Sequence, residues 1–193
     1  MKWIIRIGVI TVGIPSLFIG LLMLARFRPN RGHIQAEVEI HRPAAQVFRW
    51  ISQEELIKQW VGGLSEISLV APGANGGGNG TRFHMTEIDK EENARIEMEM
   101  TVTEYVPSEK LGVQIRSVGD PGEGFIENAE YRLAPTPDGT NLKLEIQTDY
   151  YGRLPRAFEP LITRAARKKV QRDLMRLKTL VEAETENSAG GAP

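Results

Sequence analysis

Near its C-terminal end, over residues 154–183, the chain reads LPRAFEPLITRAARKKVQRDLMRLKTLVEA. Apolar residues recur there every three or four positions, a spacing that predicts one long amphipathic helix. Its apolar stripe consists of Phe158, Leu161, Ile162, Ala165, Val170, Leu174, Leu177 and Val181. Because the sequence offers no other long amphipathic helix, we expect strands to cover this stripe.

The opposite face of the predicted helix is strongly basic. A run of like charges on one side of a helix usually indicates a solvated face, and we interpret it so here. Only Asp173 accompanies the basic residues Arg164, Arg167, Lys168, Lys169, Arg172, Arg176 and Lys178.

Short segments with alternating apolar and polar residues precede the helix. A period of two residues is typical of half-buried antiparallel strands, and turn-forming residues separate the segments. Two short helices are predicted over 44–51 and 53–60, with Ser52 and Glu55 as a capping box for the second. The predicted strands cover residues 34–41, 64–70, 81–88, 94–105, 110–118, 124–134 and 141–151.

These elements predict an α+β fold. Its order is one strand, two short helices, six strands and one long helix. We expect the seven strands to form a curved antiparallel sheet that wraps around the C-terminal helix. The domain is expected over residues 34–183, followed by a disordered tail over 184–193, which is rich in small and polar residues.

Composition excludes several classes of site. The chain has 193 residues, 41% of them hydrophobic, which suits one globular domain with an appendage. It contains no cysteine, so disulfides, zinc–thiolate sites and cysteine nucleophiles are excluded. His33, His41 and His84 are scattered and lack the spacing of helical metal ligands. We therefore expect neither a metal nor a cofactor.

The net charge of −1 conceals an uneven distribution along the chain. Residues 1–36 carry five basic and no acidic groups, and residues 37–149 carry ten basic and twenty acidic groups. Residues 150–193 carry nine basic and five acidic groups. Because nucleic-acid affinity rests on neutralising phosphates, an acidic region between two basic ends argues against a nucleic-acid partner.

The first 26 residues are typical of a transmembrane anchor. Residues 7–25 carry no charge, and at about 1.5 Å per residue a helix of this length approaches the ~30 Å bilayer core. A cleaved signal peptide is the alternative, but no A-x-A cleavage site follows. We expect a single-pass anchor over 1–26 and a linker over 27–33. Basic residues flank both ends almost equally, with a slight preference for a cytoplasmic domain.

Two neighbouring stretches resemble a known superfamily. Residues 43–51 read PAAQVFRWI, and residues 54–60 read EELIKQW. With the order of elements, they look like the SRPBCC or START-like superfamily, and are most similar to its polyketide cyclase/dehydrase and lipid-transport branch. The resemblance covers roughly residues 34–183. It implies a helix-grip fold with a deep apolar cavity between the sheet and the C-terminal helix.

Strand parity predicts which side chains face that cavity, because alternate residues of a strand share one face. Methionines on the inward face suit irregular apolar ligands, although filling of the core explains them as well. Glu127 shares the inward parity, and a buried carboxylate is costly without a partner, so we expect it to contact a ligand. A bulge that turns it outwards is the alternative. The expected cavity residues are Trp60, Phe83, Met85, Met98, Met100, Glu127, Tyr131, Tyr150, Phe158 and Ile162.

No catalytic motif is apparent. The glycine-rich residues 73–80 lead into a strand rather than a helix and lack the Lys-Ser/Thr of a phosphate-binding loop. No nucleophile elbow is present, and the family resemblance carries no universal catalytic residue. We therefore assign no catalytic residue.

The sequence favours a membrane-anchored protein that binds a hydrophobic small molecule or lipid in the cavity. One alternative is a cyclase or dehydratase in which Glu127, Tyr131 or Tyr150 acts as acid or base. The other is a protein-interaction module similar to the co-chaperone relatives, with a partner on the acidic outer face of the sheet and a filled cavity. The sequence predicts neither the ligand's identity nor the oligomeric state.

Overall fold

Seven strands and three helices make up the described part of the chain. The computed structural model describes residues 31–73, 78–89, 94–119 and 123–184. The chain enters through β1 (Arg31–Ile40), α3 (Ala44–Ser52) and α4 (Glu54–Trp60). The other elements are β2 (Leu64–Ala71), β3 (Arg82–Asp89), β4 (Ala94–Val106), β5 (Lys110–Val118), β6 (Gly124–Thr136), β7 (Gly139–Tyr151) and α5 (Arg153–Ala183).

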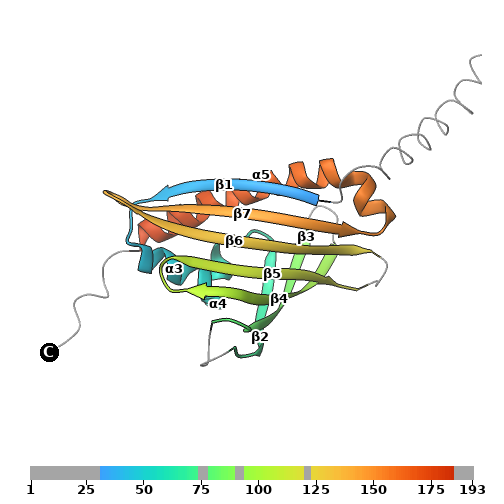
Figure 1. The fold of residues 1–193 in the computed structure, drawn as a ribbon, viewed down its shortest axis with the longest axis horizontal. Coiled ribbons are helices and arrows are strands. Elements are labelled where there is room, and N and C mark those ends of the chain that lie inside the picture. The colour runs from blue at the N-terminus through green and yellow to red at the C-terminus, as the bar shows by residue number, and fades with distance from the viewer. Residues whose placement is uncertain (1–30, 74–77, 90–93, 120–122, 185–193) are drawn as a thin grey trace, which may run out of the picture.

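The strands form one antiparallel sheet in the order β1-β7-β6-β5-β4-β3-β2. Consecutive strands are neighbours from β2 to β7, and β1 is the edge strand beside β7. Figure 1 shows the sheet curving, with α5 running along its β1 side and α3 and α4 near one end. The predicted α+β class, element order and curved antiparallel sheet are therefore confirmed, and they match the helix-grip fold.

Alternation along the strands builds the core. In β7, Leu142, Leu144 and Ile146 are buried, while Lys143 and Gln147 between and after them are exposed. The core continues through the C-terminal half of α5, where Leu174, Leu177 and Val181 have at most 2% of their surface exposed. The core is thus formed by alternate residues of the strands and by residues three or four positions apart along α5.

The first half of α5 differs from the prediction. Phe158, Leu161 and Ile162 are 44%, 65% and 36% exposed, and Ala165 is exposed as well. The apolar stripe is half-buried at Val170 and buried at Leu174, Leu177 and Val181, so the expectation of a continuous covered stripe is wrong. Helical spacing defines a face, but the tertiary fold decides how much of it is covered. Ile96, near the start of β4, is likewise 38% exposed, although it shares the parity of the buried Met98 and Met100.

The C-terminal end of α5 is held by polar contacts with α3. The Glu184 carboxylate accepts hydrogen bonds from Trp50 Nε1 at 2.8 Å and Gln46 Nε2 at 3.0 Å, and it pairs with Arg49. The bonds from Trp50 and Gln46 lower the pKa of Glu184. Glu184, which we expected in the tail, is therefore part of the folded domain. Residues 185–193 lie outside the described residues.

The structure corrects two local predictions. The helix α4 has no side-chain cap, and Ser52 instead belongs to α3, where its hydroxyl donates to the Arg49 carbonyl at 3.5 Å. The capping box is therefore wrong. In addition, β1 begins at Arg31, within the predicted linker. The predicted anchor over 1–26 lies outside the described residues, and no helix in the described ranges is long and apolar enough to cross a membrane.

Candidate ligand-binding cavity

A cavity of about 620 Å³ lies between the sheet, α5 and the two short helices. Side chains from five of the strands form most of its wall. Their apolar members include Phe83, Met85, Met98, Met100, Val102, Leu111, Val113, Ile115, Phe125, Leu144 and Ile146. From the helices come Ile51, Ile57, Trp60, Ala166, Val170 and Leu174.

Trp60 is both a core residue and part of the cavity wall. It is 4% exposed, and its indole Nε1 donates to the Trp50 carbonyl oxygen at 3.0 Å. This bond satisfies the one polar atom of the indole and fixes the ring on the wall. Trp60 therefore packs in the core and lines the cavity at the same time.

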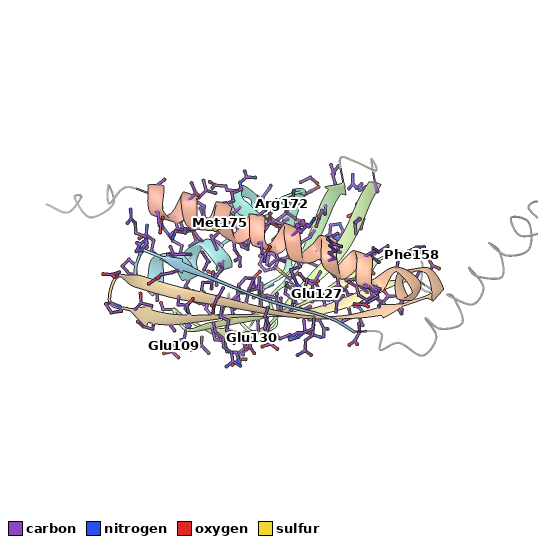
Figure 2. All side chains as sticks on the ribbon, turned by 90° about the horizontal axis from the view of Figure 1, so that it is seen from above. Glu109, Glu127, Glu130, Phe158, Arg172 and Met175 are labelled. Carbon is purple, nitrogen blue, oxygen red and sulfur yellow. The ribbon has the colours of Figure 1, made fainter. Side chains whose placement is uncertain are left out.

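Glu127 brings a carboxyl group into the apolar wall. It lies on β6 between Ile115 of β5 and Thr148 of β7, and neither pairing shows a shift in register that would turn it outwards. Figure 2 shows Glu127 on the α5 side of the sheet and Glu130 on the other side. Glu127 lines the cavity, so the surface that it retains faces the enclosed space.

The surroundings of Glu127 favour its neutral form. Burial raises the pKa of Glu127, and the Glu87 carboxylate adds to this effect. Two groups oppose it: Thr148, whose Oγ1 donates to Glu127 Oε2 at 3.3 Å, and the Lys169 ammonium. The net direction is upwards. A carboxyl group that keeps its proton can donate a hydrogen bond to a ligand as well as accept one.

Tyr131 lies near Glu127 in the cavity wall. Burial, together with the charges of Glu127 and Asp173, raises the pKa of Tyr131. The phenol therefore stays protonated and offers a hydroxyl group as donor or acceptor.

An ion cluster on α5 closes the polar side of the cavity. Lys169 Nζ lies 3.1 Å from Asp173 Oδ2 and 3.6 Å from Glu87 Oε1. Asp173 Oδ1 in turn accepts the Gly62 backbone N–H at 3.1 Å. All three charged side chains line the cavity. One ammonium between two carboxylates leaves this side polar without an excess of positive charge.

The structure brings seven of the ten predicted cavity residues together on the wall. They are Trp60, Phe83, Met85, Met98, Met100, Glu127 and Tyr131. Contact of these residues with a ligand stays a prediction.

The other three predicted residues are elsewhere. Tyr150 is buried but is not part of the cavity wall, and burial raises its pKa. Its ring lies close to Gly32 of β1, because a Cβ added at Gly32 would be 3.3 Å from the ring. Phe158 and Ile162 are on the exposed first half of α5, so the expectation that they face the cavity is wrong.

The sequence reasoning missed the polar residues of α5. Lys169 and Asp173 were assigned to a solvated helix face, yet both line the cavity. Their positions on the helix could have predicted that they lie at the cavity. Lys169 and Asp173 lie one turn apart, and each is adjacent on the helix to a buried or half-buried apolar residue, Val170 or Leu174.

Among the residues that the structure describes, no group of three or more His, Cys, Asp or Glu side chains is arranged to hold a metal ion. The cavity combines the Glu127 carboxyl group, two phenols and the ion cluster of Lys169 with other polar side chains in a mainly apolar enclosure. The second phenol is that of Tyr105, and the other polar side chains are Ser52, Gln53, Glu54, Glu55 and Thr81.

Several solved structures are similar in fold to this protein. A protein CV1439 from Chromobacterium violaceum is similar over 79% of this chain and 99% of its own, with a TM-score of 0.62 and 18% identity. Ara h 8.0201 is similar over 78% of this chain and 97% of its own, with a TM-score of 0.61 and 15% identity. At such identities the likeness concerns the fold alone.

A conserved protein from Geobacillus kaustophilus gives a TM-score of 0.63 at 12% identity, over 78% of this chain and 94% of its own. No curated protein matches the chain in sequence. The sequence profile of the family described as polyketide cyclase / dehydrase and lipid transport matches residues 31–182, which include every strand and nearly all of α5. The chain therefore belongs to the polyketide cyclase/dehydrase and lipid-transport family.

Proposed function

We propose that this protein binds a hydrophobic small molecule or lipid in the cavity between the sheet and α5. The observation that carries the proposal is a cavity of about 620 Å³ whose wall is mainly apolar and also carries polar groups. Ligand sites typically have volumes of roughly 300–1,000 Å³ and combine an apolar lining with a few orienting polar groups. The family's description, which includes lipid transport, supports the same reading.

The polar groups favour an amphiphile over a pure hydrocarbon. Glu127 in its neutral form can donate to a carbonyl or hydroxyl oxygen of the ligand, and Tyr131 lies on the same wall. The ligand's apolar part would then pack against Met85, Met98 and Met100, whose flexible thioethers adapt to its shape. A strongly charged ligand would leave its charge poorly compensated beside the paired Lys169.

Attachment to a membrane is the second part of the proposal. The uncharged residues 7–25 support it, because their length suits a single bilayer-spanning helix. In this arrangement the ligand-binding domain works on the cytoplasmic side, next to the lipid phase that would supply or receive an apolar ligand.

A matched pair of methionine substitutions tests binding in the cavity. Met98→Trp fills part of the cavity, whereas Met175→Trp makes the same change on the exposed side of α5. The full-length wild type and both variants are purified from the same host, and co-purifying molecules are extracted and compared by mass spectrometry. We expect at least one amphiphile that is abundant in the wild type and Met175→Trp and depleted in Met98→Trp. Equal amounts of every extracted molecule in all three proteins would argue against the cavity as the site.

An enzyme of the cyclase or dehydratase type is the second candidate, because Glu127 places a carboxyl group with a raised pKa in a mainly apolar cavity. Glu127→Gln is nearly isosteric and still donates a hydrogen bond, but it cannot transfer a proton. The wild type and Glu127→Gln are each incubated with the extracted ligand. If the protein is an enzyme, Glu127→Gln should lose turnover while the amount of bound ligand stays close to that of the wild type. A binding protein would leave the ligand chemically unchanged in both forms.

The interaction-module alternative is weakened by the cavity itself. That alternative predicts a filled interior, whereas the space between the sheet and α5 has ligand-sized volume. The acidic outer face of the sheet is therefore not the basis of the proposed function.

A further inference from the structure

The solvent side of α5 combines exposed apolar and basic residues. Leu161 and Met175 are 65% and 57% exposed. Between them, Arg164, Lys168 and Arg172 follow at intervals of three or four residues, so all five share one side of the helix. We refer to these five residues as the outer face of α5. Figure 2 shows Arg172 and Met175 on the side of the helix that points away from the sheet.

The basic residues of the outer face are available to a partner. Within the described ranges, Arg164, Lys168 and Arg172 are exposed and have no acidic partner. By contrast, Lys169 and Lys178, on other sides of the helix, pair with Asp173 and Glu182. Folding thus compensates the lysines near the sheet and leaves the outward charges uncompensated.

The first half of α5 also lies close to the place where the predicted anchor joins the domain. Arg167 of α5 donates to the His33 carbonyl oxygen at 3.3 Å, which fixes the start of β1 beside the first half of the helix. A Cβ added at Gly32 would lie 2.7 Å from Thr163 Oγ1, so the two elements are in close contact. Ala25, the last residue of the uncharged run, is six residues before Arg31 and hence at most about 20 Å from it.

We propose that the outer face of α5 docks on an anionic lipid surface, with the helix lying in the plane of the membrane. Helices that lie at a membrane interface combine basic residues with exposed apolar side chains. The outer face of α5 has both, with three basic residues between Leu161 and Met175. The basic groups attract anionic headgroups, while Leu161 and Met175 enter the boundary with the acyl chains. The exposed Phe158, at the start of the helix, adds a further apolar contact. This inference rests on the proposed membrane attachment, but it does not depend on the identity of the cavity ligand.

A second copy of the chain is a poorer occupant for this face. In a two-fold symmetric contact each patch meets itself, so Arg164, Lys168 and Arg172 would face their own copies. Like charges in contact disfavour such an interface. An anionic membrane supplies the opposite charge and an apolar layer together.

Docking would give α5 two roles. The inner side of the same turns contributes Ala166, Lys169 and Val170 to the cavity wall. One helix, roughly 10 Å across, would then separate the cavity from the lipid headgroups.

The absence of cysteine makes a direct test possible, since one introduced cysteine is the only labelling site. The cysteine of full-length Leu161→Cys is labelled with an environment-sensitive fluorophore. The labelled protein is then inserted into phosphatidylcholine vesicles with or without phosphatidylserine. Glu109→Cys, on the sheet side of the molecule in Figure 2, is the matched control. We expect a blue shift and quenching by lipid-borne quenchers at position 161 when phosphatidylserine is present, and no change at position 109. A probe at 161 that stays in water in both vesicles would overturn docking.

Charge removal tests the electrostatic part. Arg164→Gln, Lys168→Gln and Arg172→Gln are combined in the labelled Leu161→Cys chain. Each basic group near an anionic surface contributes about 1 kcal/mol, about fivefold, so the docked-to-undocked ratio should fall on the order of a hundredfold. The control combines Lys58→Gln, Arg82→Gln and Lys143→Gln, which remove exposed charges from other elements and should leave the ratio unchanged. Equal losses in the two triple variants would overturn a specific role for the outer face.

Two further readouts separate this inference from its alternatives. The blue shift at position 161 could instead depend on the density of protein in the vesicles and not on phosphatidylserine. That result would assign the outer face to a second copy of the chain and overturn lipid docking. Met98→Trp should leave docking unchanged even where it displaces the cavity ligand. Failure of docking and failure of ligand binding are therefore seen in different experiments.

Discussion

At the scale of single residues, Glu127 connects stability with function. A carboxyl group in an apolar wall costs free energy when it ionises, and burial accordingly raises the pKa of Glu127. Parity along β6 was enough to predict that Glu127 points inwards. Parity did not predict Lys169 and Asp173, because their approach to the cavity depends on how α5 is rotated against the sheet.

The raised pKa of Glu127 predicts a pH dependence of stability with a definite sign. The folded state holds the Glu127 proton more tightly than the unfolded chain, in which the pKa is about 4.3. Stability is therefore lost as the pH rises from that value through the folded pKa. Glu127→Gln removes the ionisation, so its midpoint temperature of unfolding should rise relative to the wild type as the pH increases.

Glu130 provides the matched control on the opposite face of the sheet. Burial alone would raise its pKa, but hydrogen bonds from Lys110 and Arg132 lower the pKa of Glu130 overall. Its stabilisation is present above the unfolded pKa and lost as the pH falls, so Glu130→Gln should cost most at neutral pH. Thermal unfolding against pH distinguishes the two variants. Parallel pH profiles for Glu127→Gln and the wild type would contradict a raised pKa of the Glu127 carboxyl group.

At the scale of elements, α5 consists of two differently packed halves. Its second half is buried against the sheet and held to α3 through Glu184, while its first half keeps its apolar residues exposed. The period of 3.6 residues predicted the helix and its length correctly. It did not predict the boundary between the halves, because that boundary is set by where the sheet and the short helices end.

Two leucines of α5 test this division. Leu177 is fully buried and Leu161 is 65% exposed. Leu177→Ala should cost roughly 2–5 kcal/mol of unfolding free energy, because it removes buried apolar surface and leaves a cavity. Leu161→Ala should change stability by no more than about 0.5 kcal/mol. Chemical unfolding followed by tryptophan fluorescence measures both. A large loss in Leu161→Ala would mean that the first half of α5 is covered by other parts of the domain.

At the scale of the whole molecule, the local periodicities of the sequence predicted most of the fold. Alternation along the strands and three-to-four spacing along α5 are read directly from the sequence, so element order and sheet type were predictable. The cavity volume was not, since it depends on how far the curved sheet and α5 stand apart after packing. The anchor over residues 1–26 and the cytoplasmic position of the domain remain predictions.

Photolabelling of the full-length protein tests the central claim, ligand binding inside the cavity, most directly. A fatty alcohol with a diazirine in its chain is added to vesicles that contain the protein, and the labelled residues are identified by mass spectrometry after irradiation. Binding in the cavity predicts labels on the buried Met98, Met100 or Val113, and their loss in Met98→Trp. Labels confined to residues 7–25 and to exposed side chains such as Leu161 would contradict it, because the alcohol would then meet the protein only from the lipid phase.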